Sequence, residues 1–140
     1  MREILFRGKS VSNNEWVEGF YEYSYMYDSL RECHRIIWVD KPTRTNYLSE
    51  VIPETVGQYT GLTDKNGKHI FEGDIVKTEI YNGKRYEKIV GVITYIKEHM
   101  AFAVYQIHER MCDIIDELHH KLEIIGNIHD NPEFLERSEG

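Results

Sequence analysis

Glu72 and Asp74 are the acidic residues in the most distinctive setting, because they flank Gly73 within segment 58–76 (QYTGLTDKNGKHIFEGDIV). Two carboxylates separated by one residue on a strand point the same way, and such a pair can act as general acid and general base. Acids beside a glycine more often cap a turn or lie at a solvated edge. We therefore interpret this pair as structural and predict no catalytic residue.

Histidine and cysteine are the next candidates, as metal ligands. His108 and Cys112 are four residues apart, a spacing that places both on one face of a helix, and His119 or His120 would add a third ligand. A structural zinc site needs four ligands in paired spacing, and the pair Cys33-His34 does not complete such a pattern. We interpret these side chains as core or surface residues, and predict no metal site.

Segment 58–76 also contains partial matches to ligand-binding loops. Residues 64–67 (DKNG) resemble the start of a calcium loop, but the EF-hand glycine is sixth and its glutamate twelfth, whereas here Gly67 is fourth and Ile75 twelfth. Glycines 57, 61, 67 and 73 match neither a phosphate-binding nor a dinucleotide-binding loop. No GxSxG motif for a nucleophilic serine is present. We predict turns here, no cofactor and no enzymatic activity.

Composition narrows the class of partner. The 140 residues carry a net charge of −7, spread over both halves of the chain, without the basic stripe that nucleic-acid binders usually show. The local cluster Lys84, Arg85 and Lys88 is the exception. Ten tyrosines against five phenylalanines suit half-buried sheet faces and subunit interfaces. Protein partners are therefore favoured over nucleic acid.

Cysteine content and hydropathy bear on localisation. Cys33 and Cys112 are far apart in the sequence. A disulfide between them is one alternative, and two reduced cysteines, an ordinary number for a cytosolic protein, are the other. The start of the chain lacks an apolar signal core, and no stretch approaches the roughly 18–20 apolar residues of a membrane span. We expect a cytoplasmic protein with no membrane partner.

Hydrophobic patterns and turn residues predict a mainly β fold. Strands are expected over 3–7, 16–25, 36–39, 47–52, 75–81, 89–96, 100–107 and 122–128. Short turns join 75–81, 89–96 and 100–107, so 74–107 is expected to form an antiparallel meander. Gly19 interrupts the second of these strands and indicates a bulge or a close backbone approach. Residues 27–35 have no clean period and are typical of a loop or helical turn.

Two helical segments are expected near the C-terminus. Met111, Ile114, Ile115 and Leu118 have the spacing of one helix face, so 108–120 is predicted to form a helix or a helical turn. Asn131 and Pro132 are typical of the first residues of a short helix.

The expected architecture has four parts. Residues 1–57 form an N-terminal β region, and 58–76 form a turn-rich connection. Residues 72–128 form a small SH3-like barrel or meander, and 129–140 form a short helix and tail.

The chain resembles the YopX family of phage and prophage proteins. The residues that carry the resemblance are 1–7 (MREILFR), segment 58–76, 91–93 (GVI) and 124–135 (IIGNIHDNPEFL), which span most of the chain. The family pattern commonly has tyrosine where this chain has Phe71 and His129. The resemblance implies a phage-encoded accessory protein of undefined role, acting in a bacterial cytoplasm and tending to self-associate, and it supplies no catalytic residues.

Two functions follow as hypotheses. The first is a non-enzymatic interaction protein that forms a homo-oligomer and binds host or phage protein. The alternative is a nucleic-acid-binding small barrel that uses aromatic stacking together with the cluster Lys84, Arg85 and Lys88, whose charge reversal would abolish binding.

Overall fold

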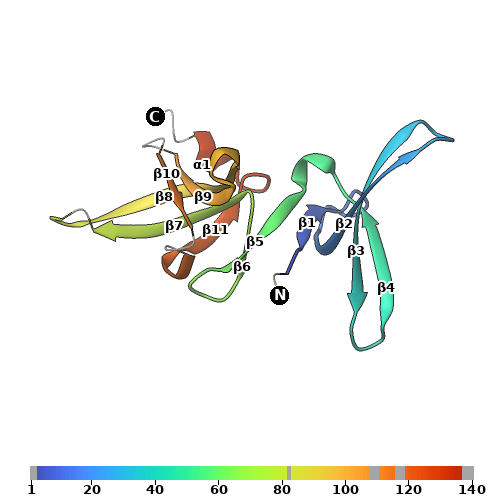
Figure 1. Ribbon diagram of the computed structural model, residues 1–140, viewed down its shortest axis with the longest axis horizontal. Coiled ribbons are helices and arrows are strands. Elements are labelled where there is room, and N and C mark those ends of the chain that lie inside the picture. Colours follow the sequence, from blue (N-terminus) through green and yellow to red (C-terminus); the bar gives the residue numbers. More distant parts are fainter. Residues whose placement is uncertain (1–2, 82, 108–110, 116–118, 137–140) are drawn as a thin grey trace. The chain divides into compact units, whose positions relative to one another are not determined.

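The computed structural model describes residues 3–81, 83–107, 111–115 and 119–136 of the chain. The protein is mainly β, as predicted, and its two sheets are antiparallel (Figure 1). The chain divides into two compact units, Met1–Tyr59 and Thr60–Gly140. None of the helices in the described part of the chain is long and apolar enough to span a bilayer.

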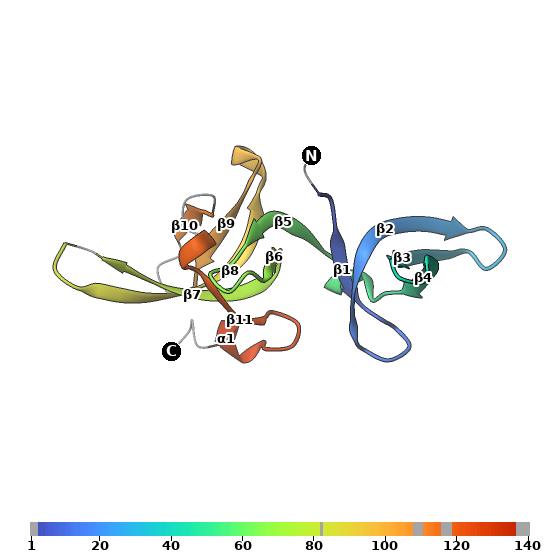
Figure 2. The same cartoon turned by 90° about the horizontal axis from the view of Figure 1, so that it is seen from below.

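The first sheet has six strands in the order β4-β3-β2-β1-β5-β6, and β5 continues across the boundary between the units. A 3-10 helix, η1, covers Pro53–Thr55. The strands are β1 (Phe6–Lys9), β2 (Trp16–Met26), β3 (Arg31–Asp40), β4 (Thr45–Glu50), β5 (Gly57–Thr63) and β6 (His69–Phe71). In the first unit β2, β3 and β4 lie side by side and β4 forms the outer edge (Figures 1 and 2).

The second sheet lies within the second unit and has the order β10-β9-β8-β7-β11. The meander predicted within 72–128 is confirmed, and the last strand returns beside the first. No pairing joins β10 to β11 among the residues that the structure describes, so the sheet is not closed into a barrel. The strands are β7 (Asp74–Tyr81), β8 (Tyr86–Ile96), β9 (Ala101–Gln106), β10 (Met111–Ile114) and β11 (Glu123–Asn127). The helical elements are η2 (Lys97–His99), η3 (His119–Lys121) and α1 (Glu133–Glu136).

The buried hydrophobic side chains are divided unequally between the units. Ten of those described belong to the second unit, where six form one cluster, and only four belong to the first. Full burial of such a side chain stabilises a fold by about 1.5–3 kcal/mol. The first unit therefore has a thin core for its size. The cluster is Ile70, Val76, Ile93, Val104, Ile115 and Leu122; the other four are Cys33, Ile36, Val51 and Tyr59.

The helix predicted at 108–120 is wrong over the part that the structure describes. Met111–Ile114 is strand β10, paired with β9 from Met111 opposite Gln106 to Ile114 opposite Ala103. An exposed edge of β9 offers backbone hydrogen bonds that outweigh a weak helical period in a short segment. Only His119–Lys121 is helical, as a single 3-10 turn. Residues 108–110 and 116–118 lie outside the described residues.

The region 27–35 also differs from its prediction of a loop or helical turn. The turn is confined to residues 27–30, and strand β3 begins at Arg31. Tyr25 lies opposite Glu32 and Met26 opposite Arg31, so the two strands pair up to the turn. The short C-terminal helix is confirmed as α1, which begins at Glu133.

Of the two alternatives predicted for Gly19, a bulge or a close backbone approach, the structure shows the close approach. A Cβ at this position would lie 2.2 Å from the carbonyl oxygen of Ile37. The pairing of β2 with β1 ends at Gly19, opposite Phe6, and its pairing with β3 begins at Phe20, opposite Ile37. Neither register contains a shift, so there is no bulge here. Glycine is required at this position because the atom that a side chain would meet belongs to the backbone.

Candidate interaction surfaces

Asp74 has a structural role at the start of β7. Its side chain is 1% exposed, and its Oδ2 accepts a hydrogen bond of 2.8 Å from the N–H of Phe71. Glu72 lies in the turn between β6 and β7, so the two carboxylates do not share a strand. The strand geometry needed for a paired acid and base is therefore absent.

The described histidines and cysteines do not gather into a set of metal ligands. The ring Nδ1 of His119 lies 2.9 Å from the carbonyl oxygen of Thr63, and its ring makes an edge contact with His120. Cys33 is a buried free thiol. His108 and the side chain of Cys112 lie outside the described residues. No group of three metal-ligating side chains occurs among those that are described.

Asp64 organises loop 64–68, the turn predicted from DKNGK. Its Oδ1 accepts hydrogen bonds of 2.9 Å from the N–H groups of Asn66 and Lys68, and its Oδ2 accepts one of 3.1 Å from Ile124 in β11. Burial raises the pKa of this carboxyl, but the hydrogen bonds from the three backbone donors lower the pKa by more than burial raises it. The pKa of Asp64 therefore lies below its ordinary value. Gly67 supplies the positive φ of 81° that the turn needs.

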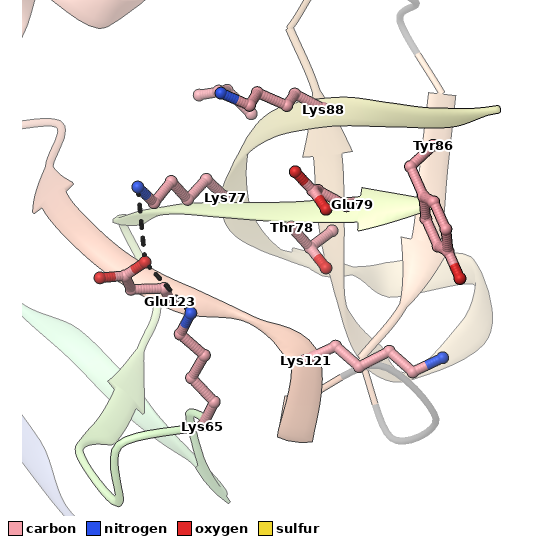
Figure 3. A pocket seen from close by; sticks show the side chains of 9 residues that line it. Lys65, Lys77, Thr78, Glu79, Tyr86, Lys88, Lys121 and Glu123 are labelled. Carbon is pink, nitrogen blue, oxygen red and sulfur yellow. Dashed lines mark ion pairs between the residues drawn. The ribbon is translucent and has the colours of Figure 1, made fainter. Parts of the chain in front are cut away.

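A groove with a volume of about 620 Å³ lies over β7, β8 and β11 in the second unit (Figure 3). Four lysines and two glutamates line it, so its lining is basic although the whole chain is acidic. We call it the lysine groove. Its lining residues are Lys65, Lys77, Thr78, Glu79, Tyr86, Lys88, Val90, Lys121 and Glu123.

Glu123 neutralises one end of the lysine groove. Its Oε2 lies 3.4 Å from Nζ of Lys65 and 3.5 Å from Nζ of Lys77. Burial raises the pKa of Glu123, but the ammonium groups of Lys65 and Lys77 lower the pKa by more than burial raises it. The pKa of Glu123 therefore lies below the ordinary value. Lys88 and Lys121 have no ion pair with any described residue. Within the described part of the chain, no acidic side chain neutralises these two lysines.

The basic cluster predicted from the sequence is only partly brought together. Lys88 lines the groove, whereas Lys84 and Arg85 lie in the turn between β7 and β8 and do not. The remaining groove lysines come from a loop, from β7 and from η3, and were not anticipated. They are dispersed in the sequence, so no local charge run could have indicated them.

The open sheet of the first unit carries an exposed row of apolar side chains. Phe20 lies opposite Ile37, and Ile37 lies opposite Leu48, so the three form one row across β2, β3 and β4. Phe20 is 64% exposed and Leu48 is 60% exposed. Residues directly opposite in a sheet lie on the same face, so the three side chains form a continuous strip, here called the apolar row.

The other face of the same three strands is aromatic. The ring of Tyr47 stacks on Trp38, with 5.7 Å between ring centroids, and Tyr21 and Tyr23 both contact the ring of His34. The hydroxyl of Tyr21 also forms a hydrogen bond with Nδ1 of His34. This network orders the aromatic face and leaves Tyr47 46% exposed beside the sheet edge.

Family membership is decided by the sequence over nearly the whole chain. The family described as "YopX protein" matches residues 5–136. The chain belongs to the YopX family. No curated protein has significant sequence similarity to it. The crystal structure of protein EF1440 from Enterococcus faecalis is similar to this YopX-family chain, with 22% identity and a TM-score of 0.49. The alignment covers 96% of this chain and 99% of that one.

The residues that carry the YopX resemblance near the C-terminus make a second structured turn. Oδ1 of Asn127 accepts hydrogen bonds from the N–H groups of His129 and Asp130, and Oδ1 of Asn131 accepts one from Asn127. A Cβ on Gly126 would lie 2.4 Å from that Asn131 oxygen. These residues, like loop 64–68, therefore hold turns in the second unit.

Proposed function

We propose that this YopX-family protein is a non-enzymatic interaction protein that self-associates through the open sheet of its first unit. The observation that supports the proposal is the apolar row on β2, β3 and β4. The family resemblance adds the expectation of a phage- or prophage-encoded accessory factor in the cytoplasm of a bacterial host.

The energetic reason lies in the thin core of the first unit. Covering a large apolar side chain contributes about 1.5–3 kcal/mol, and both Phe20 and Leu48 are more than half exposed in the isolated chain. Contiguous exposed apolar surface commonly marks a protein interface. A second copy that packs beside Leu48 would bury the edge end of the apolar row and supply burial that the unit does not obtain from its own residues.

Leu48→Lys is expected to prevent self-association. The substitution places a solvated charge at the centre of the proposed interface, while the side chain is exposed in the single chain, so folding is retained. Size-exclusion chromatography with light scattering should show the unmodified chain as an oligomer and this variant as a monomer. Leu30→Lys is the matched control, since Leu30 is 75% exposed in the turn between β2 and β3, and it should behave as the unmodified chain. Oligomers of equal mass for all three proteins would contradict the proposal.

A second function, binding of single-stranded nucleic acid, is favoured by the lysine groove. Lys88 and Lys121 provide cations for phosphates, and Tyr86, which is 70% exposed, provides an aromatic face on which a base can stack. Tyr81 lies opposite Tyr86, with their ring centroids 5.2 Å apart, and extends the aromatic surface.

Reversing the charge of Lys88 and Lys121 tests this second function. Lys88→Glu with Lys121→Glu is expected to weaken binding of a labelled oligothymidylate about tenfold or more at low salt, because phosphate contacts and counterion release are lost. Fluorescence anisotropy at several salt concentrations measures the effect. Lys97→Glu with Lys41→Glu makes the same change in net charge at exposed positions outside the groove and should have little effect. Equal weakening by both pairs of substitutions would rule out a groove-specific site.

A further inference from the structure

Strand β4 (Thr45–Glu50) is the outer strand of its sheet, and no strand of the described part of the chain pairs with its outer side. Val51 donates a backbone hydrogen bond to the carbonyl of His34, directly beyond the last pair of the β3–β4 register, Arg35 opposite Glu50. Hydrogen-bonded and non-hydrogen-bonded pairs alternate in antiparallel strands. Ser49 and Tyr47 therefore form backbone hydrogen bonds with β3. The residues between and beside them direct their N–H and C=O groups outward; these are Glu50, Leu48 and Asn46.

The outward backbone groups of β4 differ in whether they already have a hydrogen-bond partner. The carbonyl of Glu50 accepts a hydrogen bond of 2.9 Å from the N–H of Val11. Asn46 and Leu48 have no such backbone partner on the outer side of β4 in the part of the chain that the structure describes. The available edge is therefore the short stretch around Tyr47, with two N–H groups and two carbonyls.

This edge lacks the features that usually prevent pairing. Residues 45–49 (TNYLS) contain no proline, no lysine and no other charged side chain. The nearest charge along the strand, Glu50, is paired with Arg31 at 2.5 Å, and on the same face Glu22 is paired with Arg35. A second copy of the strand would therefore meet no like charge along residues 45–49, so the edge is electrostatically compatible with itself.

We propose that the self-association proposed above occurs by antiparallel pairing of β4 with β4 of a second copy, with a twofold axis between the two Tyr47 residues. Asn46 of each copy then lies opposite Leu48 of the other. Each such pair exchanges two backbone hydrogen bonds, which gives four in total and uses the N–H and carbonyl groups of both Asn46 and Leu48 in each copy.

The neighbouring registers are excluded by residues at the two ends of β4. An axis at Leu48 would place Asn46 opposite Glu50, whose carbonyl is already bonded to Val11. An axis at Asn46 would require Arg44, which lies in the turn with a positive φ of 57°. A register shifted by one residue would place an outward-facing residue of one copy opposite a residue of the other copy whose backbone groups are already hydrogen-bonded to β3.

The proposed pairing also extends the surfaces already described. The apolar row of one copy reaches Leu48, and on the same face Leu48 of the second copy lies diagonally across the new pair. The two Tyr47 rings, each stacked on its own Trp38, become cross-strand neighbours on the aromatic face. The result is a sheet continuous through both copies, the strand-addition mode of recognition.

Site-directed cross-linking tests the register. Tyr47→Cys places a cysteine at a directly opposed position, where the Cα separation of about 4.5–5.5 Å suits a disulfide. Under mild oxidation we expect this variant to form covalent dimers in several-fold higher yield than the unmodified chain. Phe20→Cys, on the apolar row but away from the edge, is the control and should stay at the level of the unmodified chain. Thr45→Cys mixed with Ser49→Cys should cross-link only as a mixture.

The outcomes separate this inference from the proposed function. Cross-linking at Phe20→Cys but not at Tyr47→Cys, or equal yields at both, would overturn edge pairing and leave self-association standing. A dimer in sedimentation that cross-links at neither position would do the same. A monomer in sedimentation at every concentration, without cross-linking, would overturn both.

Discussion

Replacing Asp64 by alanine is expected to destabilise the second unit by about 3–5 kcal/mol. The substitution removes a buried carboxylate that accepts from Asn66, Lys68 and Ile124, and leaves these three N–H groups without their acceptor. A loss of this size is a large fraction of the roughly 5–15 kcal/mol that stabilises a typical domain. Hydrogen exchange of backbone amides in β7, β8 and β11 should show the loss directly.

Asp64→Asn is the matched control for that prediction. The amide retains one oxygen, which can accept from Asn66 and Lys68, but it loses the acceptor for Ile124, so the loss should be about 1–2 kcal/mol. Equal protection of amides in the unmodified chain and in Asp64→Ala would show that the hydrogen bond from Ile124 to Asp64 does not stabilise the contact of loop 64–68 with β11.

The contribution of Asp64 should also depend on pH. Its pKa is below the ordinary value in the folded chain, so its carboxylate stabilises the fold at pH values above the unfolded pKa of about 3.9. This contribution is lost as the pH falls through the lower, folded pKa. The difference in unfolding free energy between the unmodified chain and Asp64→Asn should therefore shrink on acidification, as measured by urea unfolding.

Gly19→Ala is expected to have the second large effect, a loss of about 3 kcal/mol or more in the stability of the first unit. The new Cβ would lie 2.2 Å from the backbone oxygen of Ile37, and a backbone atom within a paired strand cannot move aside cheaply. Both tryptophans, Trp16 and Trp38, belong to this unit, so tryptophan fluorescence during urea unfolding reports on it.

Gly83→Ala separates steric overlap from the general effect of replacing a glycine, and because Gly83 lies in the second unit its stability is measured by hydrogen exchange. Gly83 has a positive φ of 97° but nothing within 4 Å of an added Cβ, so backbone strain alone should cost about 1 kcal/mol. If the two alanine variants lost equal stability, the close approach of Gly19 to β3 would be contradicted.

The sequence predicts the elements of this fold well where turn chemistry and strand patterns agree. Gly67 and Gly73 adopt the positive φ that their turns require, and the meander of β7, β8 and β9 follows from the turn signals between them. The strand character of Met111–Ile114 could not be predicted locally, because it depends on the edge of β9, which is a tertiary feature.

The candidate surfaces are less predictable from the sequence than the elements. Phe20, Ile37 and Leu48 lie on three strands, and only the register brings them into one row. The lysine groove likewise combines residues from β7, β8, η3 and a loop. The abundance of tyrosine did indicate an interface, but the partner strand and its register depend on which backbone groups remain unpaired.

Sedimentation equilibrium of the unmodified chain over a wide range of protein concentration tests self-association most directly. The structure of the first unit predicts a reversible equilibrium in which the average mass rises from monomer to dimer as the concentration increases. The same series for Leu48→Lys should stay at the mass of the monomer. A single monomeric mass for the unmodified chain at every concentration would contradict the proposed function.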